Sequence, residues 1–245
     1  AHASDYTARC VDYCAELQEL DADFRGVRLR CLKRDHFVCQ ACGLPSWPAQ
    51  GAPSGGFEVH HLNGDHADNR PGNLVTLCPL CHGIFHMGLT VRRRPGKFIW
   101  LPGVSQASLN LLVHVMAIAR LRGSLPGSAP GARRMARGAD SLWRRLSLKR
   151  LPSGCFMDPE GGDTVCLLET DPASFGAALA RLQERPGYDP GRLQRSLGGL
   201  RWLYRISSDT EAGVYADCRA WFGPRGWEED WMNCLTQYGG RYARQ

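Results

Sequence analysis

Residues 78–86 read CPLCHGIFH and place two cysteines and two histidines within nine positions. Cys78 and Cys81 have the spacing of a metal-binding knuckle, and a matching pair, Cys39 and Cys42, precedes them across 35 intervening residues. Two such knuckles can close one tetrahedral site of four thiolates, which leaves no position open for a substrate. We therefore predict a structural Zn²⁺ at these four cysteines. The alternative is a redox pair or a set of unrelated cysteines.

Histidines form a second cluster around the same stretch. Residues 57–61, FEVHH, have the pattern of a short strand, and residues 74–77, LVTL, that of its antiparallel partner. A short helix after Cys81 would carry His82 and His86 on one face, because residues four apart lie one above the other. The sequence therefore predicts a second metal site beside the zinc site.

The residue types suit hydrolysis of a phosphodiester. Alternation along a strand directs His60 and His61 to opposite faces, so they should have different roles. We predict His61 as the general base. Asn73 is predicted to orient it by bonding across the loop to backbone near His61. The predicted metal ligands are His60, His82 and His86. Imidazole favours Zn²⁺ or another transition metal, yet Mg²⁺, Mn²⁺ and Ni²⁺ stay open as the catalytic divalent metal. In the alternative interpretation, these histidines complete the zinc site or only pack beside it.

These motifs together resemble the HNH, or His-Me finger, nucleases. The resemblance covers roughly residues 32–88 and rests on RDHFVCQACG at 34–43, the His60–His61 pair, Asn73–Leu74 and CPLCHGIFH. It implies an α+β fold with a zinc-stapled ββα-metal core and a DNA endonuclease or nickase activity. The paired histidines and the terminal H-x-x-x-H look most like the colicin DNase subgroup, in which an acid also lies near the site, at the position of Glu58.

A second resemblance extends over most of the chain. The chain is similar to the IcmJ/DotN family of type IVB secretion and conjugation systems. The similar stretches are residues 64–76, 99–102, 106–115, 171–176 and 200–203. It implies an adaptor that docks onto a coupling ATPase. Relatives are known that keep the nuclease fold and lose its histidines, whereas this sequence retains His60, His61, His82 and His86. A catalytically silent adaptor is therefore the alternative to a nuclease, although a nuclease bound to a transfer machine would satisfy both.

Composition divides the chain into segments. Helical spacing of apolar residues predicts a helix over residues 5–34. Residues 97–101 are predicted to form a short strand, followed by a helix that Ser105 caps and that extends through Leu121. A stretch rich in Gly, Pro and Ser predicts a linker. The predicted segments are an N-terminal helical segment (1–30), the HNH-like zinc domain (31–90), a strand–helix extension (91–122), a flexible linker (123–140) and a mainly helical C-terminal domain (141–245).

Positive charge is concentrated after the nuclease-like motif. Residues 91–150 carry 13 basic side chains and one acidic side chain, whereas residues 1–90 carry 7 and 10. Such an excess is typical of a surface that binds a polyanion, although a solvated arginine-rich linker would have the same composition. We predict DNA contacts from the cluster that follows the motif, namely Arg92, Arg93, Arg94 and Lys97. A DNA-binding module without catalysis is a third possibility.

The sequence indicates no membrane span, because no apolar run reaches the roughly 18–20 residues that a span requires. No signal peptide is visible, and the 11 cysteines do not form the even, compact framework of a small secreted domain. We therefore expect a cytoplasmic protein. A transfer machine could hold it at the inner face of the membrane through other proteins.

Overall fold

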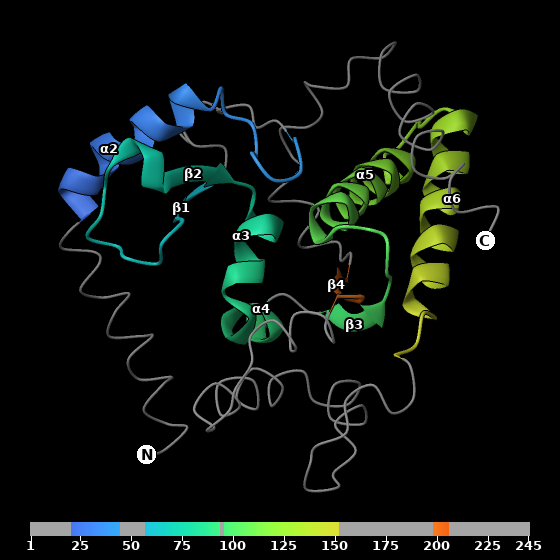
Figure 1. Cartoon of the computed structure of the whole chain (residues 1–245). Coiled ribbons are helices and arrows are strands. Elements are labelled where there is room, and N and C mark those ends of the chain that lie inside the picture. Colours follow the sequence, from blue (N-terminus) through green and yellow to red (C-terminus); the bar gives the residue numbers. More distant parts are fainter. Residues whose placement is uncertain (1–20, 45–56, 94–95, 152–197, 206–245) are drawn as a thin grey trace, which may run out of the picture.

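The computed structural model describes residues 21–44, 57–93, 96–151 and 198–205. These residues form two small antiparallel sheets of two strands each and a set of helices, so the fold is mixed α+β. In Figure 1, α2 and the β1–β2 hairpin lie on one side, α5 and α6 on the other, and α3 between them. None of the described helices is both long and apolar enough to cross a lipid bilayer.

The first sheet agrees with the predicted strands. β1 (Glu58–His61) pairs antiparallel with β2 (Leu74–Leu77), which follows the short 3-10 helix η1 (Pro71–Asn73). His60 lies opposite Val75. Burial alternates along β1, with Val59 and His61 buried and their neighbours half-buried, because successive side chains of a strand point to opposite faces.

α2 (Asp21–Arg34) packs against this hairpin and is fastened to it at its C-terminal end. The buried Asp35 carboxylate accepts hydrogen bonds from the Thr76 amide at 2.9 Å and from the Arg34 guanidinium at 2.7 and 2.9 Å. Arg34 also donates to the carbonyls of Leu74 and Pro71. Burial alone would raise the pKa of Asp35, but the hydrogen bonds from Arg34 and Thr76 outweigh it and lower that pKa.

Two short helices follow β2. Cys78 caps α3 (Pro79–Phe85), its sulfur accepting from the Cys81 amide, and Pro79 occupies the first turn, where no amide hydrogen is needed. The helix ends at Phe85, since His86 has φ −122° and ψ 49°, and α4 (Met87–Arg93) begins one residue later. His82 is therefore helical, while His86 lies just beyond the end of the helix.

The second half of the fold combines a helix pair with the other two-stranded sheet. Ser105 accepts from the Ser108 amide at 3.0 Å and caps α5 (Gln106–Ser124), as the sequence predicts. β3 (Gly96–Trp100) falls on the predicted strand and pairs antiparallel with β4 (Leu200–Tyr204), about a hundred positions away in the chain. Because β4 also packs against α5, it closes this half of the core.

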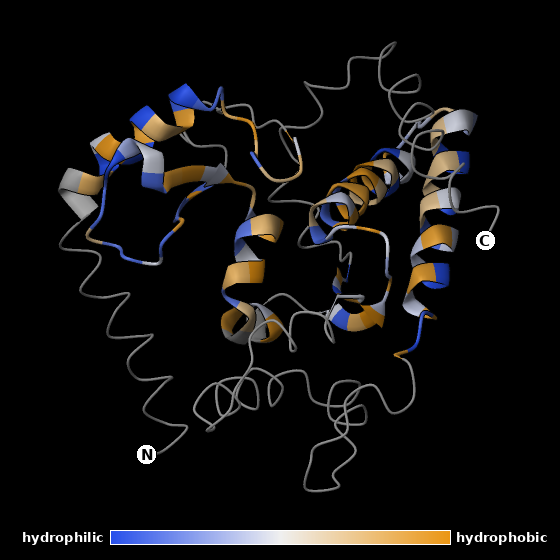
Figure 2. Ribbon diagram, in the orientation of Figure 1, coloured by the Kyte–Doolittle hydropathy of each residue, from blue (hydrophilic) through white to orange (hydrophobic). Residues whose placement is uncertain are grey.

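The prediction of a flexible linker over 123–140 is wrong, because α6 (Pro130–Ser147) occupies most of that range. Small residues, which suggest a linker, instead allow close packing: a Cβ at Gly123 would lie 2.4 Å from the Ala136 Cβ. α6 is amphipathic, with apolar residues at Met135, Ala139 and Leu142 toward the core and arginines outward. Figure 2 shows this alternation along the helix.

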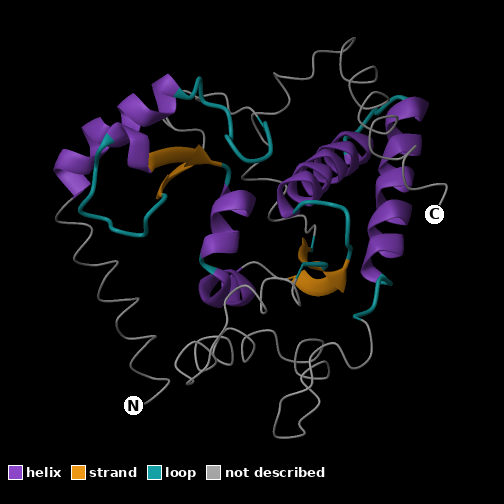
Figure 3. Ribbon diagram, viewed as in Figure 1, coloured by secondary structure: helices purple, strands orange, loops and turns teal. Residues whose placement is uncertain are grey.

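Two further segment predictions differ from the structure in part. The C-terminal domain (141–245) is predicted to be mainly helical, yet residues 200–204 form β4 (Figure 3). This strand is held by its pairing with β3, about a hundred positions earlier in the chain. The boundary predicted at residue 30 falls inside α2. Predictions for residues 1–20, 152–197 and 206–245, including three of the four C-terminal tryptophans, lie outside the described residues.

Candidate metal sites

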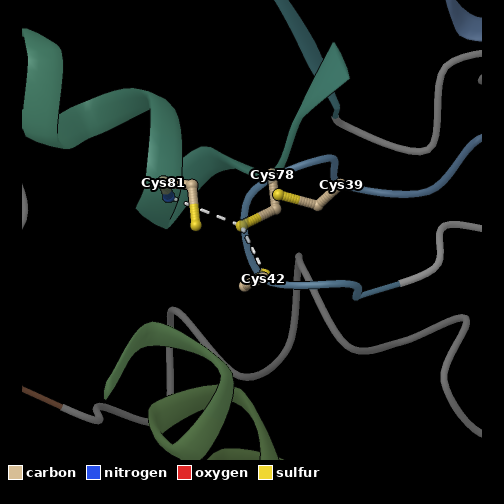
Figure 4. A group of neighbouring side chains, drawn as sticks. All are labelled: Cys39, Cys42, Cys78 and Cys81. Carbon is tan, nitrogen blue, oxygen red and sulfur yellow. Dashed lines mark hydrogen bonds between the residues drawn. The ribbon is translucent and has the colours of Figure 1, made fainter. Parts of the chain in front are cut away.

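The four predicted zinc ligands meet in the core. Cys39 and Cys42 come from the loop after α2, and Cys78 and Cys81 from the start of α3, with their side chains directed toward one another (Figure 4). All four are buried, and their sulfur atoms lie within 4.8 Å of one another. Gly43 follows the first pair with φ +76°, a left-handed conformation that glycine adopts without strain.

The geometry and chemistry of this four-cysteine cluster fit a tetrahedral Zn²⁺. Thiolates bound at about 2.3 Å from zinc lie roughly 3.8 Å apart. The Cys42 and Cys78 sulfurs are 3.8 Å apart. Contact with Cys39, reinforced by burial, raises the pKa of both Cys42 and Cys78. A raised pKa means that the thiolate form is disfavoured. A divalent cation would stabilise all four thiolates together, so the buried cluster is consistent with structural zinc.

The three histidines predicted as catalytic ligands also converge. His60 on β1, His82 on α3 and His86 just after it each offer a ring nitrogen, and these atoms lie within 4.8 Å of one another. The His82 and His86 ring centroids are 4.7 Å apart, and those of His60 and His82 are 5.4 Å apart. Phe85 stacks on His60 with centroids 4.1 Å apart and is itself 60% exposed, so the cluster lies near the surface.

Two of these histidines have lowered pKa values, which favours the neutral ring. Burial, then the neighbouring His82 and His86, lowers the pKa of His60 to about 4. Burial and His82 also lower the pKa of His86. Neutral imidazole is the form that coordinates a metal. The Glu58 carboxylate contacts Nδ1 of His82, which leaves Nε2 of that ring for a metal, as in the carboxylate–histidine–metal arrangement of many sites.

His61 lies apart from this cluster, as strand alternation predicts. Its ring stacks on Phe24 of α2, with centroids 5.6 Å apart, and lies 5.0 Å from the ring of His66. His61 is 4% exposed, and its Nε2 lies 3.0 Å from the Asn69 side-chain oxygen. An amide oxygen can only accept, so the hydrogen is placed on Nε2 and Nδ1 keeps the basic lone pair.

Asn73 bonds across the loop to backbone near His61, and not to the His61 ring itself. Its oxygen accepts from the Asn63 amide at 3.0 Å, and its nitrogen donates to the Asp68 carbonyl at 2.8 Å. The side chain that hydrogen-bonds to the His61 ring is Asn69, which was not predicted as an orienting residue. An irregular loop separates Asn69 from His61 in the sequence, so no periodic pattern could have identified Asn69 as its partner.

The structure describes the predicted DNA-binding residues only in part. Arg92 and Arg93 lie on α4, but their side chains, like all of Arg94, are outside what the structure describes. Lys97 is exposed on β3.

Sequence reasoning missed two neighbours of the four-cysteine cluster. The Asn110 side chain donates to the Cys81 sulfur at 3.4 Å, and His114 Nε2 lies 3.2 Å from the Cys78 sulfur. Both are polar residues, four apart, on the largely apolar helix α5. That spacing is the one local signal that could have drawn attention to them.

Together, the small two-stranded sheets, the two packed helices and the buried four-cysteine cluster are consistent with a zinc-binding HNH fold. No family model matches the chain. The chain is distantly similar to type 4 apparatus protein DotN of Legionella pneumophila, with 32% identity over 101 residues, 40% of this chain and 44% of DotN. It is also 39% identical over 57 residues to H-N-H endonuclease F-TflIV of Escherichia phage T5, 22% of this chain and 24% of that protein. Each match therefore spans less than half of the relative.

Proposed function

We propose that this chain is a metal-dependent endonuclease or nickase that hydrolyses DNA phosphodiesters. The observation that carries the proposal is the convergence of His60, His82 and His86 on one point near the surface, apart from the complete four-cysteine cluster. Three protein ligands leave a coordination position for water or a phosphate oxygen, which is the pattern of catalytic rather than structural metal sites. The similarity to the phage T5 endonuclease supports the same chemistry.

The three rings fit one ion with small side-chain rotations. Imidazole nitrogens around a tetrahedral Zn²⁺ lie roughly 3.3 Å apart. In the structure, the ring nitrogens of the three histidines lie within 4.8 Å of one another. A bound divalent metal, Zn²⁺, Ni²⁺, Mn²⁺ or Mg²⁺, would act as a Lewis acid that neutralises charge on the phosphate. Phe85, stacked on His60, holds that ring in place at the edge of the site.

His61 is the proposed general base. With the Nε2 hydrogen directed to Asn69, Nδ1 is the nitrogen that would take a proton from the attacking water. Asn73 supports this arrangement indirectly, because its bonds to Asn63 and Asp68 fix the loop that carries Asn69. Asn69 and Asn73 are therefore proposed as positioning residues.

The proposed activity is tested by incubating supercoiled plasmid with the full-length protein and Mg²⁺, Mn²⁺, Ni²⁺ or Zn²⁺ added separately. Wild type should nick or linearise the plasmid with at least one metal. His61→Ala should cut about 10²–10⁴-fold more slowly, because it lacks the general base. His82→Ala should lose the metal response, whereas His36→Asn, which removes an exposed histidine outside the cluster, should cut like wild type. If wild type fails to cut the plasmid with each of the four metals, the nuclease proposal fails.

The similarity to the type 4 apparatus protein DotN favours a second candidate, a component of a type IV secretion apparatus. The family resemblance implies that such a component docks onto a coupling ATPase. This role does not require catalysis and is compatible with it. The test is affinity purification of the tagged full-length chain from cells that express its own transfer system. Stable recovery of the coupling ATPase, unaffected by His61→Ala, supports the docking role. Absence of every transfer component contradicts it.

A further inference from the structure

α5 carries a polar stripe along an otherwise apolar face. Gln106, Asn110 and His114 recur every fourth position and therefore lie one above another on the helix. Asn110 is 1% exposed and His114 is fully buried. Burying such polar side chains costs free energy unless each has a hydrogen-bond partner. The partners therefore indicate the structural role of these residues.

Two of these partners are the sulfurs of the second cysteine knuckle. The Asn110 amide donates to Cys81 Sγ at 3.4 Å, and His114 Nε2 lies 3.2 Å from Cys78 Sγ. A metal-bound thiolate has no hydrogen to donate, so the imidazole nitrogen must carry it and donate to the sulfur. Four thiolates and one Zn²⁺ leave a net charge of −2 in the core, which N–H donors from α5 would partly neutralise.

The hydrogen bonds continue from the cluster to β4. The Asn110 oxygen accepts from Gln106 Nε2 at 2.9 Å, and Gln106 in turn accepts from the Trp202 amide and donates to its carbonyl, each at 2.9 Å. Tyr204, also on β4, donates its hydroxyl to the carbonyl of Leu80, inside the second knuckle, at 2.8 Å. β4 is therefore hydrogen-bonded to the surroundings of the cysteines at two residues, Trp202 and Tyr204.

We infer that Asn110 and His114 are positioning residues of the zinc site. They hold the thiolates of Cys81 and Cys78 by N–H···S hydrogen bonds, and Asn110 alone is joined through Gln106 to β4. This inference concerns the four-cysteine cluster alone and stands whether or not the chain is a nuclease. Loss of such partners around a metal typically lowers its affinity about 10–100-fold.

The test replaces the structural zinc of the full-length protein with Co²⁺ and records its absorption. Hydrogen bonds to a thiolate lower the energy of the sulfur electrons, so Asn110→Leu and His114→Leu should move the sulfur-to-cobalt charge-transfer band to longer wavelength. Zinc affinity, measured by competition with a chelating dye, should fall about 10–100-fold. His114→Gln keeps an N–H donor and should restore part of both effects.

Met116→Ala is the packing control, because Met116 is fully buried on the same helix and has no N–H donor in its side chain. It should lower stability without moving the charge-transfer band. The inference is overturned if Asn110→Leu and His114→Leu leave the band where Met116→Ala leaves it. It is also overturned for His114 if the wild-type spectrum is that of three thiolates and one nitrogen and His114→Leu abolishes the nitrogen contribution, because His114 would then be a ligand.

Discussion

Asp35 is a single carboxylate on which the junction of α2 and β2 depends. It is 8% exposed and accepts from both the Arg34 guanidinium and the Thr76 amide. Asp35→Ala would leave a buried amide and part of a guanidinium without their acceptor, so we expect a loss of about 3 kcal/mol in the free energy of unfolding. Urea denaturation of the zinc-loaded protein measures this loss. Arg70→Ala, which removes the ion pair of an exposed arginine with Asp68, should change stability far less.

His60 makes stability depend on pH in a defined direction. Its pKa is about 4 in the folded chain, against an ordinary value of about 6.5 when unfolded. Between these values the unfolded chain binds more protons, so the free energy of unfolding rises with pH from about 4 to 6.5. With zinc limited to one equivalent per chain, the urea midpoint should therefore fall more on acidification from about pH 7 to about pH 5.5 in wild type than in His60→Asn. Equal decreases in both proteins would contradict this account of His60.

Residue types and spacing were enough to predict which side chains meet. The cysteine pairs and the histidines at 60, 82 and 86 all converge as expected, because ligand spacing and strand alternation are local properties. The partners of these residues were not predictable in the same way. Asn69 reaches His61 through an irregular loop, and Asn110 reaches Cys81 across 29 positions of sequence. The polar stripe on α5 was visible, but nothing local indicated that it faces the cysteines.

α5 and α6 depend on small residues where they cross. Gly123 has no room for a side chain, since an added Cβ would lie 2.4 Å from the Ala136 Cβ and 2.9 Å from the Ala132 carbonyl oxygen. Gly123→Leu should therefore push the helices apart and destabilise the fold by about 1–3 kcal/mol. Thermal unfolding checks this expectation. Gly138→Leu, where an added Cβ meets nothing within 4 Å, is the matched control. A wild-type Tm for Gly123→Leu would show that the helices do not pack this closely.

α6 presents a face of exposed arginines to solvent. Those positioned along one side of the helix are Arg133, Arg134, Arg137, Arg144 and Arg145. If the chain binds DNA, Arg137→Glu with Arg144→Glu should weaken binding and flatten its salt dependence by about 0.9 in slope for each phosphate that the protein no longer neutralises. Fluorescence anisotropy at several salt concentrations measures this change.

The control for α6 makes the same charge change on α2, with Lys33→Glu and Arg30→Glu at two exposed positions. Its DNA affinity and salt dependence should stay closer to those of wild type. Equal losses for the two pairs of substitutions would show that α6 has no special role.

Elements were predictable where a local pattern had one interpretation. Ser105 as a cap and residues 97–101 as a strand needed no tertiary information. Residues 123–140 did: glycine and alanine there favour a linker by composition, but against α5 they allow close helix packing and therefore a helix. β4 was missed because its partner strand lies about a hundred positions earlier in the chain, a separation that no local pattern reports.

At the scale of the whole molecule, the four-cysteine cluster lies where the two halves of the fold meet. The second knuckle contacts α5 through Asn110 and β4 through Tyr204. Removal of zinc should therefore increase amide hydrogen exchange in α5 and β4 as well as around the cysteines, because the joint loses its fixed partners. Exchange measured by mass spectrometry with and without a chelator tests this expectation. Increased exchange confined to residues near the cysteines would show that the halves hold together without the metal.

We propose that the chain binds two metal ions, one in the cysteine cluster and one among His60, His82 and His86. Native mass spectrometry of the full-length protein, after loading with Zn²⁺ or Ni²⁺ and removal of excess metal, tests it most directly. We expect two ions per chain in wild type and in His36→Asn, and one in His82→Ala. A single ion in wild type, unchanged by His82→Ala, would contradict the histidine site and with it the proposed nuclease activity.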